Sequence, residues 1–278
     1  MQRHISIWKL FVAMTTLFCI ANSQVSAKDS KTVKVFLLAG QSNMAGKGKI
    51  RELKPPYSEP LQKIMMWNWK GQAWSALTPG IGNRRGQVGP EISFGHAIAK
   101  AFPGEDVRLI KFAIDGTSLY DDWSPKEKKK PYTGFMSIAK KALGNLDAAK
   151  VNYEIAGMLW LQGESDAHEN KAGDYGTNLT EFIAHMRTNF KTSDMPFIIA
   201  RVRSYYGGKT GQAKIVRDTQ VKIAESDKNA GWFDTDDLPL SKGHYTTVGL
   251  IEVGKRFAAT FQKVAEKANG HHPKKRKR

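Results

Sequence analysis

The segment Val35-Phe-Leu-Leu-Ala-Gly-Gln-Ser-Asn-Met-Ala-Gly46 carries the strongest structural signal in this chain of 278 residues. An unbroken apolar run ends there at a glycine, and a serine follows almost at once. Such a run is typical of a strand buried on both faces of a parallel sheet. Ligands of open α/β sheets bind beyond the carboxyl ends of these strands. The segment therefore predicts a strand over Val33–Ala39 that presents the hydroxyl of Ser42 at a reactive site.

Strand patterns and amphipathic helix patterns alternate along the rest of the chain. The predicted strands are Val33–Ala39, Val107–Ile114, Glu154–Leu161, Pro196–Val202 and Gly231–Phe233. The predicted helices are Glu91–Ala101, Gly134–Leu143, Tyr175–Phe190, Gln212–Ser226 and Thr247–Ala268. This alternation predicts an α/β fold with a doubly wound parallel sheet of about five strands. Two insertions interrupt it, a loop with a small hairpin over Leu53–Asn83 and a loop over Asp121–Thr133.

The two ends of the chain differ in composition from the middle. Residues 1–27 combine Arg3 and Lys9 with an apolar stretch and the small-residue pattern Val25-Ser26-Ala27, as in a cleaved secretion signal. The apolar stretch is short for a membrane span, so we expect a secreted or periplasmic protein with no stable membrane insertion after cleavage. A single domain over 28–268 and a disordered basic tail over 269–278 complete the predicted organisation.

Composition excludes several kinds of chemistry. The only cysteine, Cys19, lies in the predicted signal, so the mature chain has no disulfide, no thiol nucleophile and no thiolate metal site. No metal and no cofactor is predicted. Of the net charge of +17, five positive charges lie in Lys274–Arg278, and the remainder is mildly basic. We expect no nucleic-acid partner; a tail that retains the protein near anionic polysaccharide is the alternative to a merely solvated one.

A serine hydroxyl is a weak nucleophile that needs a base, most often histidine, to accept its proton. His96 and His185 fall inside helix patterns, while His271 and His272 belong to the tail. His244 lies in the segment Asp234–Leu250, on a polar loop just before the last predicted helix. The sequence therefore predicts His244 as the general base for Ser42.

Acyl transfer also needs hydrogen-bond donors where negative charge develops on the carbonyl oxygen, each worth roughly 3–4 kcal/mol. Gly116 follows the second long predicted strand, and the third ends in Trp160-Leu-Gln-Gly-Glu-Ser-Asp166. The predicted oxyanion donors are the backbone N–H groups of Ser42 and Gly116 and the side-chain amide of Gln162.

Substrate contacts are predicted at four further positions. Gln41 and Asn43 flank the nucleophile, and His168 follows the end of the third strand. Trp67 lies in the first insertion with Trp69. Its ring either packs against the domain or serves as a platform for a sugar ring.

Four separated blocks together resemble the SGNH hydrolase superfamily, and within it the sialate O-acetylesterases and the acetylxylan esterase-like enzymes of carbohydrate esterase family six. The blocks are Gly40–Met44 with Gly89-Pro-Glu91, Gly116–Leu119 with Trp123, Trp160–Asp166, and Leu238–Gly249. The resemblance implies a three-layer α/β/α flavodoxin-like fold, a Ser–His–Asp type triad and metal-independent removal of O-acetyl groups from a sugar. Ser42 would be the nucleophile, His244 the base, and Gly116 and Gln162 would serve the oxyanion.

One position departs from that family pattern. Members usually carry an aspartate three residues before the histidine, where this chain has Ser241. Either a Ser–His dyad works without an acid, or Asp237, Asp236, Glu164 or Asp166 replaces it. For Glu164, a contact with the Ser42 loop is the preferred interpretation.

These observations predict an exported serine esterase that removes acetyl groups from an oligo- or polysaccharide. The alternative is a carbohydrate-binding protein that keeps the fold and has lost turnover along with its acid. A polyanion-binding protein would explain the charge but not the four blocks. The identity of the sugar and the oligomeric state do not follow from the sequence.

Overall fold

The computed structural model describes residues 32–82, 87–168, 171–204, 211–268 and 270. All of them belong to one compact unit, Lys31–Arg278. The predicted signal segment 1–27 and, apart from Gly270, the basic tail 269–278 lie outside the described residues. Both stay predictions.

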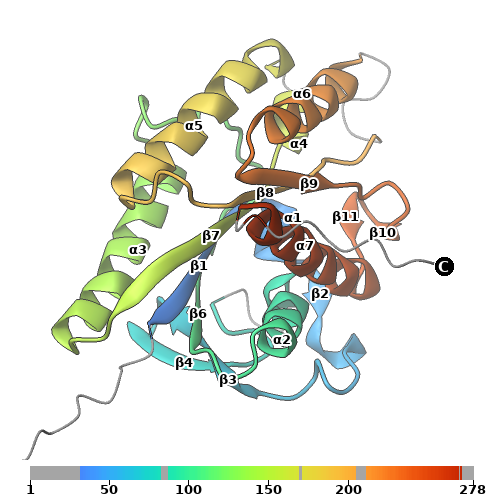
Figure 1. Cartoon of the computed structure of the whole chain (residues 1–278). Helices are drawn as coiled ribbons and strands as arrows, with labels where there is room; N and C mark the ends of the chain where they lie inside the picture. The colour runs from blue at the N-terminus through green and yellow to red at the C-terminus, as the bar shows by residue number, and fades with distance from the viewer. Residues whose placement is uncertain (1–31, 83–86, 169–170, 205–210, 269, 271–278) are drawn as a thin grey trace, which may run out of the picture. The chain divides into compact units, whose positions relative to one another are not determined.

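A seven-stranded sheet runs through this unit in the order β4-β3-β6-β1-β7-β8-β9 (Figure 1). Its strands are β1 (Val33–Gly40), β3 (Leu61–Asn68), β4 (Ala73–Leu77), β6 (Val107–Ala113), β7 (Tyr153–Leu161), β8 (Phe197–Ala200) and β9 (Ala230–Phe233). The neighbouring strands pair in parallel, except that β4 is antiparallel to β3. The order β6-β1-β7-β8-β9 is the flavodoxin-like 2-1-3-4-5 arrangement. The predicted doubly wound α/β class is confirmed.

The hairpin predicted in the first insertion extends this sheet from the predicted five strands to seven. Strand β3 pairs in parallel with β6, with Ile64 opposite Val107 and Met66 opposite Leu109. Strand β4 then forms the edge. Exposed and buried residues mix along both strands, so neither has the continuous apolar run by which a central parallel strand is recognised.

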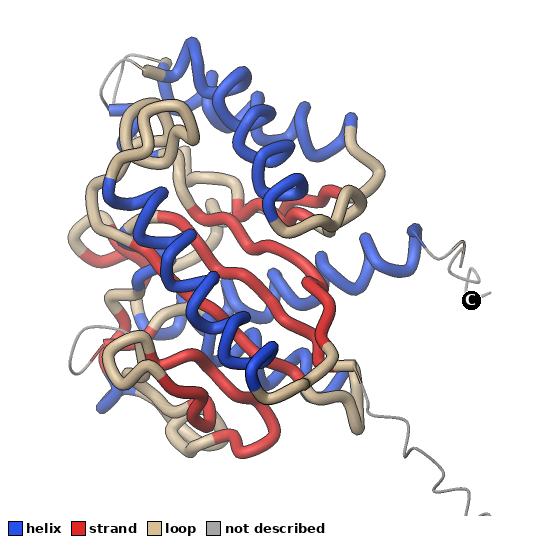
Figure 2. The backbone as a smooth tube through the Cα atoms, turned by 90° about the vertical axis from the view of Figure 1, so that its left-hand side faces the viewer, coloured by secondary structure: helices blue, strands red, loops and turns tan. Residues whose placement is uncertain are grey.

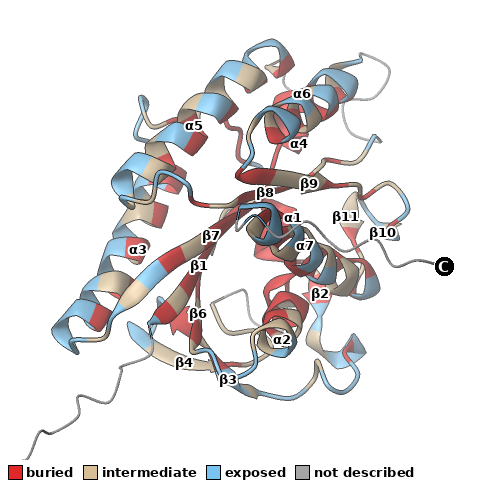
Figure 3. Cartoon of the chain, in the orientation of Figure 1, coloured by how far each residue is buried: buried red, intermediate tan, exposed pale blue. Residues whose placement is uncertain are grey.

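Helices cover both faces of the sheet (Figures 1 and 2). Helices α3 (Lys130–Ala148), α5 (Tyr175–Asn189) and α6 (Gln212–Ser226) pack on one face, and α2 (Glu91–Ala101) and α7 (Thr247–Ala268) on the other. Side chains of β1 alternate between the two cores, as strand geometry requires. Val35 and Leu37 join the core with α3, α5 and α6, whereas Phe36 and Leu38 join the core with α2 and α7. Figure 3 shows this buried central sheet between helices with exposed outer surfaces.

Short elements follow the long strands. They are α1 (Ser42–Ala45), β2 (Gly48–Lys49), the 3-10 turn Ile50–Glu52, β5 (Gln87–Val88), α4 (Glu164–His168), the 3-10 turn Ala172–Asp174, β10 (Leu240–Ser241) and β11 (His244–Tyr245). Strand β2 pairs with β5, and β10 pairs with β11. Within the part of the chain that the structure describes, every helix is too short or too polar to cross a membrane.

Candidate active site

The carboxyl ends of the three central strands meet beside Ser42. Gly40, the last residue of β1, is opposite Ala113 of β6 and Leu161 of β7. A Cβ atom at Gly40 would overlap the carbonyl oxygen of Leu161, and Gly40 has a φ of +150°. Glycine is therefore required at this close approach, after which the chain turns into α1 and Ser42 begins the helix.

Ser42 and His244 meet at this edge of the sheet although 202 positions separate them. The Ser42 Oγ and the His244 Nε2 are 3.0 Å apart. Ser42 is buried, with 6% of its surface exposed, and His244 is half-buried as the first residue of β11. A hydroxyl that hydrogen-bonds an unprotonated imidazole nitrogen can pass its proton to that nitrogen as it attacks an acyl carbon.

Hydrogen bonds from the residues that follow His244 attach its hairpin to the loops after β1. The backbone N–H of Tyr245 donates to the Asn43 Oδ1 at 3.1 Å. The Thr247 hydroxyl donates to the Glu52 Oε2 at 2.5 Å and accepts from the Lys49 N–H at 2.9 Å. Because these contacts fix the backbone around His244, the imidazole is held against Ser42.

The other nitrogen of the ring faces a backbone carbonyl. The His244 Nδ1 lies 3.2 Å from the carbonyl oxygen of Lys242. With a proton on Nδ1, the ring donates to this oxygen and leaves Nε2 free to accept from Ser42. Ser241, which stands where an aspartate is usual, contributes no carboxylate. Among the described residues, no carboxylate hydrogen-bonds this ring.

Asp236 and Asp237, two of the four predicted substitutes for that acid, pair with arginines. Both Asp237 oxygens accept from Arg256, at 2.7 and 2.6 Å. Arg256 lowers the pKa of Asp237 to about 2. Both Asp236 oxygens accept from Arg217, at 3.0 and 2.6 Å. These pairs brace the loop before β10.

The other two acids, Glu164 and Asp166, are buried in α4. The Glu164 Oε1 accepts from the Asn43 Nδ2 at 2.8 Å, which is the predicted contact with the Ser42 loop. Asp166 accepts the backbone N–H groups of Leu119 at 2.9 Å and Tyr120 at 3.1 Å. Burial raises the pKa of both carboxyl groups.

Two of the three predicted oxyanion donors are unengaged. The backbone N–H groups of Ser42 and Gly116 have no acceptor among the described residues. The Gln162 Nε2 donates to the carbonyl of Thr117 at 3.0 Å and to Asp166 at 2.6 Å, which uses both of its hydrogens. In this arrangement Gln162 ties the Gly116 loop to β7, and its oxyanion role stays a prediction.

Residues 32–263 match the family model described as "Carbohydrate esterase, sialic acid-specific acetylesterase". The chain belongs to this family. A similar protein from Arabidopsis thaliana, named a probable carbohydrate esterase, is 26% identical over 249 residues, covering 82% of this chain and 90% of the relative.

Two solved structures share the fold of this esterase. One, of a protein from Arabidopsis thaliana, has a TM-score of 0.69 at 24% identity and covers 84% of this chain and 98% of its own. The other is a carbohydrate acetylesterase from Xanthomonas citri, with a TM-score of 0.61 at 18% identity. It covers 84% of this chain and 56% of its own.

Of the four residues of the esterase predicted to contact substrate, three are buried and one is exposed. Trp67 is 2% exposed and packs edge-on against Trp74 in the core, so the predicted sugar platform is wrong at this residue. Gln41 and Asn43 are also buried, and Gln41 accepts from the Ser165 hydroxyl at 3.2 Å. His168 is exposed at the end of α4. The ring is buried because the hairpin that carries Trp67 is part of the central sheet.

A buried ion pair beneath the nucleophile was not predicted. The Lys111 ammonium donates to the Glu91 carboxylate at 2.6 Å and to the carbonyl of Ala45, the last residue of α1, at 2.9 Å. Lys111 is 2% exposed and Glu91 is fully buried. Lys111 lies in β6 between Ile110 and Phe112, and a lysine at a buried position of a central strand is the sequence signal that could have indicated the pair.

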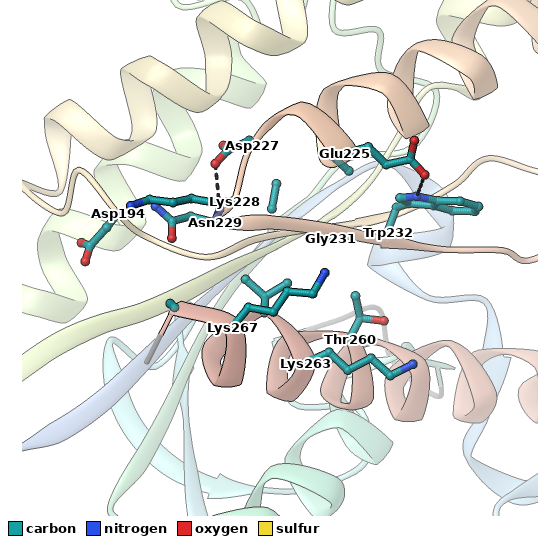
Figure 4. A pocket seen from close by; sticks show the side chains of 14 residues that line it. Asp194, Glu225, Asp227, Lys228, Asn229, Gly231, Trp232, Thr260, Lys263 and Lys267 are labelled. Carbon is teal, nitrogen blue, oxygen red and sulfur yellow. Dashed lines mark hydrogen bonds between the residues drawn. The ribbon is translucent and has the colours of Figure 1, made fainter. Parts of the chain in front are cut away.

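A cavity of about 680 Å³ lies elsewhere in the esterase, between α6, β9 and α7 (Figure 4). Trp232, which donates to Glu225, forms part of its wall. Neither Ser42 nor His244 lines it. In the described ranges, no three histidine, cysteine or acidic side chains come together as metal ligands do.

Proposed function

We propose that this esterase removes O-acetyl groups from carbohydrates with Ser42 as nucleophile and His244 as general base. The 3.0 Å contact between the Ser42 Oγ and the His244 Nε2, at the carboxyl edge of the sheet, carries the proposal. Membership of a carbohydrate esterase family supports an acetylated carbohydrate as the substrate class, and we propose an oligo- or polysaccharide within it.

The reaction has two steps in this proposal. The Ser42 Oγ attacks the acetyl carbonyl as His244 accepts its proton, and the negative oxygen of the tetrahedral intermediate faces the N–H groups of Ser42 and Gly116. The intermediate collapses when the C–O bond to the sugar breaks and His244 returns the proton to the leaving sugar oxygen. Water, deprotonated by His244, then attacks the acetyl-enzyme, releases acetate and restores the Ser42 hydroxyl.

The test measures acetate release from 4-nitrophenyl acetate and from acetylated glycans. Ser42→Ala and His244→Ala should each lower kcat by at least about 10²-fold, the lower end of what a general base contributes. Ser226→Ala is the matched control, because Ser226 is an exposed serine whose hydroxyl bonds the carbonyl of Ile223 in α6. Equal rates for wild type and Ser42→Ala would reject the proposal.

A proposed exported location rests on the sequence of residues 1–27. Expression of the full chain in a bacterium, followed by separation of periplasm, medium and cytosol, should give a mature protein that begins after Ala27. Deletion of residues 2–27 should leave the protein in the cytosol. An uncleaved chain in the cytosol would contradict export.

One observation favours a second function, sugar binding without turnover. The His244 ring bonds a neutral carbonyl instead of a carboxylate, which leaves the imidazolium less stabilised. A binding protein would show heat of binding with an acetylated glycan in calorimetry and no acetate release over the Ser42→Ala background.

A further inference from the structure

We infer that Lys242 is the positioning residue for His244, and that its backbone carbonyl replaces the acid of a Ser–His–acid triad. This inference rests on the proposed function. The observation behind it is the 3.2 Å contact between the His244 Nδ1 and the Lys242 oxygen, opposite the 3.0 Å contact between Nε2 and Ser42. One ring thus has a backbone acceptor on one nitrogen and the nucleophile on the other.

The turn between β10 and β11 presents this carbonyl. Lys242 and Gly243 are its two residues, and both have positive φ, +49° and +77°. Two left-handed residues in a two-residue loop are the pattern of a type I′ hairpin turn. Lysine adopts this conformation at a cost, and the pairing of Ser241 with His244 on the flanking strands maintains it.

An acceptor that cannot donate fixes the tautomer of the ring. A carbonyl oxygen only accepts, so the Nδ1 facing it must carry the proton, and Nε2 must be the lone-pair nitrogen that faces Ser42. Replacement of a triad aspartate by asparagine reverses this tautomer and costs about 10⁴ in kcat. The Lys242 carbonyl supplies the orienting half of the acid's role without its charge. Turnover is therefore slower than with a carboxylate but is retained.

The first test is the tautomer of His244 in the full chain. With ¹⁵N-labelled histidine, the two ring nitrogens give distinct chemical shifts according to which one carries the proton, and His244→Gln identifies the signals of His244. We expect the proton on Nδ1 in the neutral ring. A ring protonated on Nε2 would overturn the inference, whatever the activity.

The second test displaces the carbonyl. A Cβ atom at Gly243 would meet no atom within 4 Å, and the φ of +77° is one that L residues rarely adopt, so Gly243→Val strains the left-handed turn without a clash at Cβ. We expect kcat to fall between about 10-fold and the 10⁴-fold that follows loss of ring orientation, with KM nearly unchanged. Gly211→Val is the matched control, because Gly211 has a φ of +75° in equally open space at the start of α6. It should keep wild-type kcat, and equal losses in both variants would overturn the inference.

The third test adds a carboxylate. Directly paired residues of antiparallel strands point their side chains to the same face, so Ser241→Asp places an acid beside the His244 ring. Ser241→Asp alone should raise kcat, and together with Gly243→Val it should recover the kcat that Gly243→Val loses. If Gly243→Val lowers kcat and Ser241→Asp does not restore it, the turn only supports the fold, and the inference is overturned. Ser42→Ala, run in parallel, separates this result from failure of the esterase proposal itself.

Discussion

The backbone N–H of Tyr245 donates to the Asn43 side chain at 3.1 Å, which joins the residue after the histidine to the residue after the serine. The other end of the same amide donates to Glu164 at 2.8 Å. Asn43 therefore connects three loops that follow different strands. Because its side chain is buried, with 1% exposed, water does not compete for these bonds. This amide is therefore one of the contacts that set the spacing of Ser42 and His244, together with those of Thr247.

Asn43→Ala should damage both activity and stability. It leaves the N–H of Tyr245 and the carboxyl of Glu164 without these hydrogen bonds in a buried place, at a cost of about 1–3 kcal/mol for each unsatisfied group. We expect a lower free energy of unfolding in urea and a lower kcat, with a smaller change in KM. Asn68→Ala is the control, since it also removes two side-chain bonds but in the exposed turn between β3 and β4. An unchanged kcat in Asn43→Ala would show that the amide does not position the pair.

Removing one charge of the buried ion pair of Lys111 and Glu91 beneath α1 should lower the stability of the protein more than removing both charges. Lys111→Met leaves the Glu91 carboxylate uncompensated in the core, which typically costs about 3–5 kcal/mol. Lys111→Met with Glu91→Gln removes both charges, so the double variant should be more stable than the single one in urea. Lys214→Met breaks an exposed pair with Asp218 and should cost about 1 kcal/mol at most. A double variant less stable than Lys111→Met would contradict this account.

The central strands and the Ser42–His244 pair could be predicted because their signals are local. The run through Val35 and Leu38 is apolar at every position, as burial on both faces requires. Ser42 and His244 each follow a recognisable pattern near an element boundary. Their meeting across the fold follows from the doubly wound order of the strands, which brings loop ends to one edge.

Other features depend on contacts between distant segments and leave little trace in the sequence. The sequence leaves open whether Trp67 is packed or exposed, and the pairing of β3 with β6 places it in the core. The partner of Lys111 is Glu91, which by itself looks like a residue of a helix first turn. The contact of the His244 ring with Lys242 is local, yet it involves a backbone oxygen, for which no residue type is diagnostic.

The same substitution at two aspartates should separate an acid that braces the surface from one that holds the site. Asp237→Asn weakens an exposed pair with Arg256, and kcat should stay within about twofold of wild type, as for most surface changes. Asp166→Asn places an NH₂ group among the N–H groups of Leu119, Tyr120 and Gln162. Because donors then face donors, the Gly116 loop should shift and kcat should fall. A large loss of kcat in Asp237→Asn would instead make Asp237 the missing acid.

Glu164 should make the folded protein less stable as the pH rises. Burial raises the pKa of its carboxyl in the folded chain, while the unfolded chain has the ordinary value of about 4.3. Between these two values the folded state binds more protons than the unfolded state, so the free energy of unfolding falls with rising pH and is constant above the raised value. Glu164→Gln removes this titration and keeps an oxygen for Asn43. In urea unfolding at a series of pH values, the free energy of unfolding of Glu164→Gln should rise relative to that of wild type from about pH 4.3 upward. Asp166 titrates in both proteins, so its contribution to this difference largely cancels. Glu59→Gln, at an exposed position, is the matched control. A difference that shrinks with rising pH would mean that Glu164 is held in its charged form by its contacts, and Asn43 would then be the partner of a carboxylate.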